Sequence, residues 1–251
     1  MKKNKLKNKK NYPLIGTWSS LSSTNAIDVL GKTNLDFIII DLEHGMTTFE
    51  NLENMIRICE LNNISPIIRC MNDEQQEILK CLETGCDSIM IPHVNNENKA
   101  KKIAESCKYF PIGKRGLSPY TRVHDYDHKD INIKIKEKNT NNFVGILVEG
   151  QEGIQNLDKI SKIKGIDLIY LGLFDISQSV GLPGKLNNKK VIDKVIECQK
   201  IISSNGKLSG CMSVDIKYSK MLLNYGYNFI AYLNDAYALK SFFDNELKNI
   251  R

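Results

Sequence analysis

The stretch FIIIDLEHG, residues 37–45, runs four large apolar residues directly into three ionisable ones, Asp41, Glu43 and His44. A continuous apolar run, without alternating polar residues, is typical of a strand that is buried on both faces, as in a parallel sheet. Polar residues that directly follow such a strand lie at its C-terminal end. The stretch therefore predicts a buried parallel strand that ends in a polar rim.

Similar apolar runs recur along the chain, with helical patterns between them. The expected strands are 14–18, 35–41, 65–69, 88–92, 143–149, 167–173, 207–212 and 228–233. Eight such strands in 251 residues fit one α/β domain, a (β/α)8 TIM barrel, over residues 13–251. A doubly wound open sheet is the alternative, but the first strand-to-helix turn lacks the GxGxxG pattern of a dinucleotide site.

Composition narrows the class of protein. Residues 1–12 contain six lysines and no apolar signal region, so we expect a basic disordered tail there. Without this tail the chain is close to neutral, which argues against a nucleic-acid partner. No apolar run reaches the roughly 18 residues that suggest a membrane span. The seven cysteines show no CxxC spacing, which indicates reduced, mostly buried thiols and a cytoplasmic protein.

One segment interrupts the alternation of strands and helices. Residues 113–142 form a long polar stretch between the fourth and fifth expected strands. Connections of this length are usually functional or disordered. We therefore expect a loop there that contributes to selectivity for the substrate.

Ionisable residues gather at the expected C-terminal strand ends, which is where barrel enzymes carry their active sites. Glu149 and Asp175 follow adjacent strands, and two carboxylates in one mouth favour an oxygen-binding cation such as Mg²⁺ or Mn²⁺. Arg69 would add a permanent positive charge for an enolate or carboxylate oxygen, and His44 suits proton transfer. Structural roles remain open: the carboxylates could cap helices, and His93, which follows a proline, is expected to be structural.

In order along the chain, these pieces resemble the metal-dependent (class II) 2-oxo-acid aldolases. This family includes 4-hydroxy-2-oxoheptanedioate aldolase and 2-dehydro-3-deoxyglucarate aldolase, and is distantly similar to the citrate lyase β-subunits. The matching pieces are GTWSSLSS (16–23), LDFIIIDLEHG (35–45), PIIR (66–69), LETGCDSIMIPHV (82–94), KYFPIGKRG (108–116), VEGQEGIQNLDKI (148–160), IDLIYLGLFDISQSVGLPG (166–184) and NFIAYLNDAYAL (228–239). The resemblance implies a TIM barrel of the phosphoenolpyruvate/pyruvate-domain type. It also implies a homo-oligomer, usually a hexamer, in which neighbours exchange a C-terminal helix.

The resemblance also implies roles for individual residues. Glu149 and Asp175 would be ligands of a divalent metal ion, Mg²⁺ or Mn²⁺, with Co²⁺ as a further candidate. Arg69 would stabilise the pyruvate enolate, and His44 would act as acid–base through water. The other implied site residues are Glu83 as partner of the histidine, Trp18 and Asp41 on the substrate side, and Gly172, Leu173 and Phe174 around the pyruvate carboxylate.

Some residues depart from the family pattern. The chain has Glu83 where the family usually has Asp, Leu147 where it often has Gln, and Leu173-Phe174 where it usually has Pro and a small residue. The expected function is formation or cleavage of a carbon–carbon bond between a 2-oxo acid, pyruvate, and an aldehyde, by way of a 4-hydroxy-2-oxo acid. The alternatives are a citrate lyase-like acyl-CoA lyase, and a catalytically weakened family member that acts as a binding protein.

Overall fold

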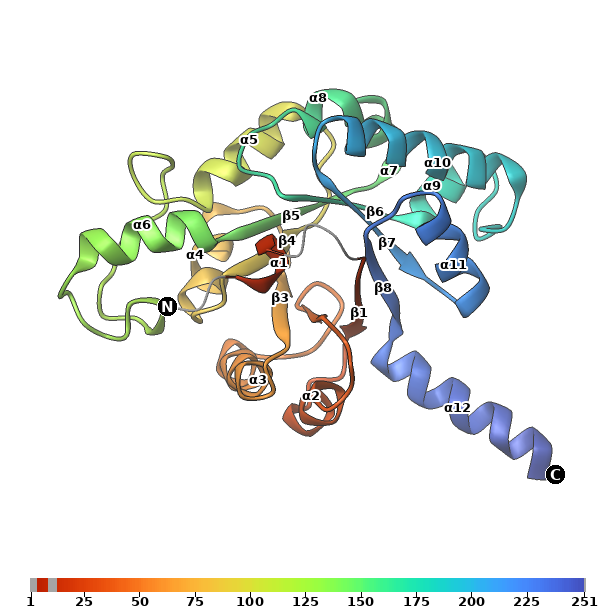
Figure 1. Cartoon of the computed structure of the whole chain (residues 1–251), viewed down its shortest axis with the longest axis horizontal. Coiled ribbons are helices and arrows are strands. Elements are labelled where there is room, and N and C mark those ends of the chain that lie inside the picture. The colour runs from red at the N-terminus through yellow and green to blue at the C-terminus, as the bar shows by residue number, and fades with distance from the viewer. Residues whose placement is uncertain (1–3, 9–12, 251) are drawn as a thin grey trace.

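The computed structural model describes residues 4–8 and 13–250, and at its centre is a closed barrel of eight parallel strands (Figure 1). The strands are β1 (Leu14–Ser19), β2 (Phe37–Asp41), β3 (Ser65–Arg69), β4 (Ser88–Ile91), β5 (Phe143–Val148), β6 (Leu168–Leu171), β7 (Leu208–Ser213) and β8 (Phe229–Asn234). Each strand pairs with the next, and β1 pairs with β8 to close the barrel. The predicted (β/α)8 barrel is therefore confirmed, and the open-sheet alternative is wrong.

Helices follow the strands and surround the barrel (Figure 1). They are α2 (Thr24–Gly31), α3 (Phe49–Leu61), α4 (Gln75–Glu83), α5 (Glu97–Ser106), α6 (Ile131–Asn141), α7 (Gly150–Gln155), α8 (Leu157–Ser161), α9 (Leu173–Ser179), α10 (Lys189–Ser204), α11 (Ile216–Asn224) and α12 (Asp235–Ile250). Polar side chains set several helix starts: Ser23, Thr48 and Asp215 each accept a hydrogen bond from the first turn of α2, α3 and α11.

The strands serve two apolar cores at once, which explains the continuous apolar runs. In β2, Phe37 and Ile39 belong to the core inside the barrel. Their neighbours Ile38 and Ile40 belong to the outer core between the barrel and the helices. Inside the barrel, Phe37 stacks on Phe229 with ring centroids 4.0 Å apart. Since alternate residues face opposite sides of a strand, neither side of β2 has room for polar residues.

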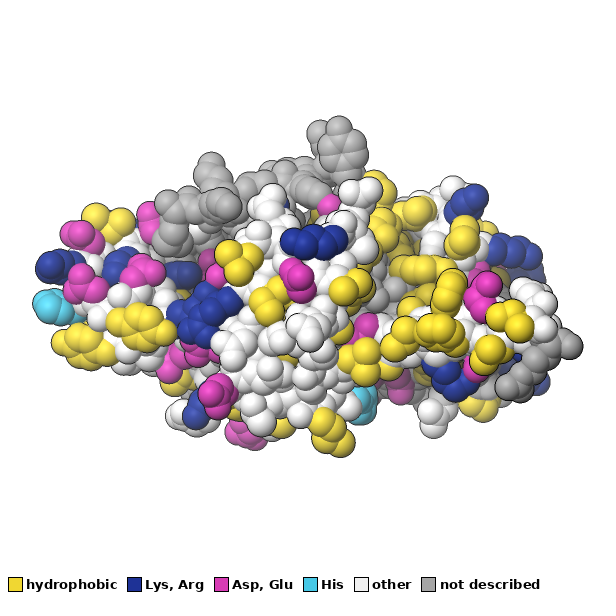
Figure 2. Space-filling model, turned by 90° about the horizontal axis from the view of Figure 1, so that it is seen from below, with side chains coloured by type: hydrophobic (Ala, Val, Ile, Leu, Met, Phe, Trp, Pro, Cys, Tyr) yellow, Lys and Arg dark blue, Asp and Glu magenta, His cyan; other side chains and the backbone are white. Residues whose placement is uncertain are grey.

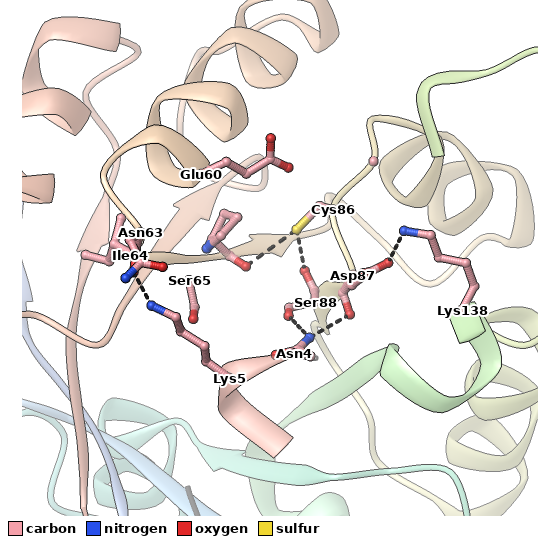
Figure 3. Close-up of a pocket in the computed structure, with 12 residues that line it drawn as sticks. Asn4, Lys5, Glu60, Asn63, Ile64, Ser65, Cys86, Asp87, Ser88 and Lys138 are labelled. Carbon is pink, nitrogen blue, oxygen red and sulfur yellow. Dashed lines mark hydrogen bonds and ion pairs between the residues drawn. The ribbon is translucent and has the colours of Figure 1, made fainter. Parts of the chain in front are cut away.

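A short helix, α1 (Lys5–Asn8), closes the barrel floor, meaning the N-terminal ends of the strands. Leu6 is 2% exposed and joins the inner core. Beside it, Asn4 donates to Ser88 Oγ at 2.8 Å, and Lys5 Nζ donates to the Asn63 carbonyl at 2.6 Å (Figure 3). The expected disordered tail is thus ordered over residues 4–8, because one apolar side chain finds a place in the core. Residues 1–3 and 9–12 of that tail lie outside the described residues.

The segment 113–142 is only partly a loop, so the expectation of a continuous loop is corrected. It contains a 3-10 turn, η1 (Arg122–His124), and the helix α6. The buried residues of α6 are polar: Lys138 pairs with Asp87 at 2.8 Å, and Asn139 exchanges hydrogen bonds with the backbone of Tyr109. A helix that packs through polar groups leaves no apolar stripe in the sequence.

The last helix, α12, leaves the barrel and projects away from it (Figure 1). Its first residue, Asp235, is 8% exposed and accepts hydrogen bonds from Ser19 Oγ at 2.7 Å and from the Ser20 amide at 3.0 Å. Beyond this anchor, large apolar side chains are exposed, and Figure 2 shows them gathered on the α12 side of the molecule. They are Tyr237, Leu239, Phe242, Phe243, Leu247 and Ile250.

Two expectations drawn from composition agree with the structure. All seven cysteines are buried and free. Among the described residues, no helix combines the length and apolar character needed to cross a membrane.

Candidate active site

Nine of the ten predicted site residues line a single cavity in the barrel mouth, where the strands end. Its volume is about 420 Å³. The nine residues are Trp18, Asp41, His44, Arg69, Glu149, Gly172, Leu173, Phe174 and Asp175. Residues from five separate strand ends and the loops after them thus meet because the barrel aligns the C-terminal ends of its strands.

Arg69, the last residue of β3, is held from three sides. The register between β2 and β3 places it opposite Asp41, to which its guanidinium donates two hydrogen bonds, one of 2.8 Å from Nε to Oδ1. Its Nη1 lies 3.0 Å from Glu43 Oε2, and its guanidinium carbon lies 4.6 Å from the Trp18 ring centroid. Bidentate pairing and aromatic stacking suit arginine in particular. The result is a permanent positive charge with a fixed orientation.

Trp18 and Tyr170 form the rigid inner wall of the cavity. Trp18 Nε1 donates to the Tyr170 hydroxyl at 2.9 Å, and the two rings meet edge to face with centroids 5.6 Å apart. Burial raises the pKa of Tyr170 well above its ordinary value, so its hydroxyl stays protonated. Trp18 is thereby fixed in the orientation that stacks on Arg69.

Glu149 and Asp175 approach each other across the backbone of Gly172. Glu149 directly follows β5 and Asp175 lies in the first turn of α9. A Cβ at Gly172 would lie 2.8 Å from Asp175 Oδ2 and 3.5 Å from Glu149 Cβ. Burial raises the pKa of Glu149, and the nearby charges of Asp175 and Glu43 raise it further. The Glu149 side chain does not cap α7, so the structural role that the sequence left open for it is not observed.

This pair of carboxylates fits a divalent cation. Two carboxylates at close range repel each other unless a cation or a proton compensates them, and the charge of Asp175 adds to the effect of burial in raising the pKa of Glu149. An oxygen-only donor pair suits Mg²⁺ or Mn²⁺. Within residues 4–8 and 13–250, no three His, Cys, Asp or Glu side chains come together as a complete metal site. An ion held by Glu149 and Asp175 would therefore take its other ligands from water and substrate.

His93 is the site residue that the sequence reasoning undervalued. It follows β4 in the left-handed backbone region, with φ at 56°. Its amide donates to Glu149 Oε1 at 3.1 Å, its Nδ1 lies 3.2 Å from the same oxygen, and its Nε2 lies 2.8 Å from Glu43 Oε1. Its position at the end of β4 was the available signal. The contacts with both carboxylates required the folded structure.

The chain matches the HpcH/HpaI aldolase/citrate lyase family model over residues 14–239, which is most of its length. It belongs to this family. The 2-keto-3-deoxy-L-rhamnonate aldolase of Klebsiella pneumoniae is 27% identical over 224 residues, which are 86% of this chain and 81% of the relative. The enzyme of the same name from Salmonella paratyphi A is 25% identical over 240 residues, covering 93% and 87%.

Solved structures of HpcH/HpaI proteins share the fold of this chain. A family protein from Burkholderia cenocepacia superposes with a TM-score of 0.92 at 21% identity, covering 99% of both chains. An HpcH/HpaI aldolase from Desulfitobacterium hafniense gives a TM-score of 0.91 at 21% identity, covering 98% of this chain and 95% of the other. The resemblance drawn from the motifs is confirmed by the family match.

Glu83 lies apart from the other site residues predicted from the HpcH/HpaI resemblance. It ends α4, which runs from the mouth back towards the barrel floor, and it lines a separate depression together with Tyr120 and Arg122. His44 lies exposed on the rim, with its amide bonded to Asp41 Oδ1 at 3.1 Å. Within the described part of the chain, no hydrogen bond or ion pair joins Glu83 to His44. The LETG motif closes a helix before β4, so topology alone directs Glu83 away from the mouth.

Proposed function

We propose that this HpcH/HpaI family member is a divalent-metal-dependent aldolase that uses pyruvate as its donor. It would join pyruvate to an aldehyde, or cleave the 4-hydroxy-2-oxo acid that results. The observation that carries the proposal is the convergence of Glu149, Asp175 and Arg69 on one cavity in the barrel mouth. The curated relatives named as aldolases support the same class, the carbon–carbon lyases.

The donor half of the site is built for an enolate. Glu149 and Asp175 would hold the metal ion, which when bound supplies an electrophilic centre for negative charge on oxygen. Arg69 faces the same cavity with a guanidinium that Asp41, Glu43 and Trp18 have already oriented. A hydrogen-bond donor that is already oriented before the reaction stabilises developing negative charge effectively. Pyruvate loses a proton from its methyl carbon to His44, through water, and Arg69 stabilises the negative charge that moves to the 2-oxo oxygen.

The acceptor half needs a group that moves a proton at the aldehyde oxygen. His44 stands on the rim of the cavity, and imidazole suits proton transfer near neutral pH. In synthesis, carbon 3 of the enolate attacks the aldehyde carbon, and His44, through water, delivers a proton to the new alkoxide oxygen. In cleavage, His44 takes the proton from the 4-hydroxyl, the bond between carbons 3 and 4 breaks, and its electron pair forms the enolate.

Exchange of the pyruvate methyl protons in D2O, followed by NMR, tests the donor half without any aldehyde. We expect exchange with Mn²⁺ or Mg²⁺, none with EDTA, and a loss of at least 100-fold in Arg69→Ala and Glu149→Gln. Arg57→Ala, an exposed arginine on α3, serves as the matched control and should exchange normally. Metal binding without exchange would reject the pyruvate aldolase and favour a binding protein. Exchange on an acyl-CoA donor instead would favour the citrate lyase-like alternative.

We also propose that the protein works as a homo-oligomer, and by family resemblance as a hexamer, in the cytoplasm. The apolar side chains that α12 exposes support this assembly. Large contiguous apolar surfaces are unusual on monomers and commonly mark protein interfaces. A second copy of the chain would cover them.

A further inference from the structure

The positive charges of the mouth are already matched by its own carboxylates. Among the described residues that line the cavity, Arg69 is the single lysine or arginine, and both Asp41 and Glu43 pair with it. The charge of a divalent ion on Glu149 and Asp175 would be balanced by those two carboxylates and by the carboxylate of pyruvate. A second carboxylate, carried on the aldehyde, would find no free cation on the described lining and would be repelled by the existing negative charges.

The outer part of the cavity carries one large apolar side chain, that of Phe174. Phe174, in the first turn of α9, lines the cavity while 56% exposed, whereas its apolar neighbours Leu147 and Leu173 are 4% and 2% exposed. An aldehyde that enters after the donor is seated deep in the mouth therefore meets Phe174 first. A large exposed aromatic side chain on a ligand cavity gains by covering itself with apolar surface of the ligand.

We propose that the aldehyde is uncharged and carries an alkyl chain, and that this chain packs on the side chain of Phe174. The inference rests on the proposed aldolase function and specifies the acceptor. It rests on two features of the same cavity. The positive charge of Arg69 is already paired with carboxylates of the protein, and an apolar residue lies at the entrance. Ser20 and Asn234, bonded to each other at the rim, leave room for a neutral polar group on the chain but bring no charge.

Butanal and succinic semialdehyde test the charge requirement, because both have four carbons and they differ in a terminal carboxylate. With pyruvate and Mn²⁺, we expect kcat/KM for butanal to exceed that for succinic semialdehyde by at least tenfold. Phe174→Ala should lower the butanal value about tenfold, and Phe174→Arg should reverse the preference. Tyr225→Ala removes a partly exposed aromatic side chain at the far end of α11 and should leave the ratio unchanged.

A binding measurement tests the cavity without catalysis. Trp18 is the only tryptophan and lines the cavity, so its fluorescence reports ligand binding in the metal-free protein. Butyramide should bind at least tenfold more tightly than succinamate, which has the same chain and a terminal carboxylate. Phe174→Ala should weaken the binding of butyramide and so reduce this difference.

The outcomes separate the inference from the proposed function. Normal pyruvate exchange with equal or better use of succinic semialdehyde would overturn the inference alone. So would a preference for butanal that is undiminished in Phe174→Ala. Absence of pyruvate exchange in the wild-type protein would reject the proposed function, and the fluorescence comparison would then decide whether the cavity selects neutral alkyl ligands. Tighter binding of succinamate would overturn the inference in either case.

Discussion

At the scale of the residue, the site depends on shared contacts rather than on isolated side chains. Glu43 pairs with Arg69 on one side and with His93 on the other, and His93 continues to Glu149. The network thus connects the group expected to stabilise the enolate with a proposed metal ligand. A change at one end is expected to alter the geometry at the other.

His93→Asn tests this network. Asparagine tolerates the left-handed backbone of this position and keeps the amide that donates to Glu149, but its side chain is too short to bridge to Glu43. We expect the affinity for Mn²⁺ to fall about tenfold, as is typical when a residue that orients a metal ligand is lost. Isothermal titration with Mn²⁺ measures the change, with the exposed His128→Asn as control. Unchanged affinity would show that His93 does not orient Glu149.

Sequence reasoning found most of this cavity because a barrel brings its strand ends together. Residues such as Arg69 and Glu149 stand directly after apolar runs, so their placement follows from the fold. His93 and Glu43 were harder to evaluate, because their importance depends on distances between loops. Glu83 was carried over from a motif, although its position at the end of a helix already pointed away from the mouth.

At the scale of the element, polar and apolar packing leave different traces in the sequence. The strands were predicted to within about two residues because two apolar cores require uninterrupted apolar runs. The helix α6 was missed because its buried residues, Lys138 and Asn139, are polar. The helix α1 was missed because one buried leucine among lysines gives no periodic signal.

Leu6→Ala tests whether α1 is part of the folded core. Leu6 is 2% exposed in the inner core, so we expect the substitution to lower the free energy of unfolding by about 2 kcal/mol. Urea denaturation measures the change. Leu61→Ala is the matched control, since Leu61 is 85% exposed and its loss should cost less than about 0.5 kcal/mol. Equal stability of both variants would mean that α1 does not hold the barrel floor.

His124→Gln tests the buried histidine that η1 places beside Tyr109. His124 is fully buried and its Nε2 lies 2.9 Å from the Tyr109 hydroxyl. Burial, followed by the charges of Arg115 and Lys138, lowers the pKa of His124 from its ordinary value to about 4. In the unfolded chain the pKa of this histidine is about 6.5. Between pH 6.5 and pH 4, His124 is therefore mostly protonated in the unfolded chain and mostly neutral in the folded protein.

The stability that this neutral histidine contributes is complete above about pH 6.5 and is lost as the pH falls towards 4. We expect the wild-type protein to lose about 2 kcal/mol more than His124→Gln between pH 7 and pH 4.5. Urea unfolding at both pH values gives the difference, in which other titrating groups cancel. His128→Gln, on an exposed histidine, should follow the wild-type protein. Parallel pH profiles for wild type and His124→Gln would contradict the prediction.

At the scale of the whole molecule, α12 is the helix whose apolar side chains a single chain leaves uncovered. Only the first residue of α12, Asp235, is buried against the barrel, and the rest of the helix extends beyond it with apolar side chains exposed (Figures 1 and 2). The apolar pattern of the sequence could not show that the last helix leaves the barrel. Only its family resemblance suggested exchange between neighbours.

Replacing Phe242 and Phe243 with serine tests the assembly. We expect the wild-type protein to have a solution mass that is a multiple of 28.5 kDa, and the double variant to shift towards the monomer, because it loses the largest apolar groups of α12. Light scattering after size-exclusion chromatography gives the masses. Lys248→Ser, on the same helix, should keep the wild-type mass. A wild-type mass of one chain would contradict the homo-oligomer.

The pairing of β1 with β8 also determines how late in synthesis the complete barrel can form. Ser19 and Asp235 are 216 positions apart, and their hydrogen bond joins the first strand to the residue that follows the last. Until that residue is available, β1 lacks one neighbour and the loop after it lacks its carboxylate anchor. Contacts between such distant parts of a chain form slowly, because a long loop must close first. We therefore expect the mouth to be among the last parts of the protein to form during synthesis, and activity to appear only after Asp235 has emerged from the ribosome.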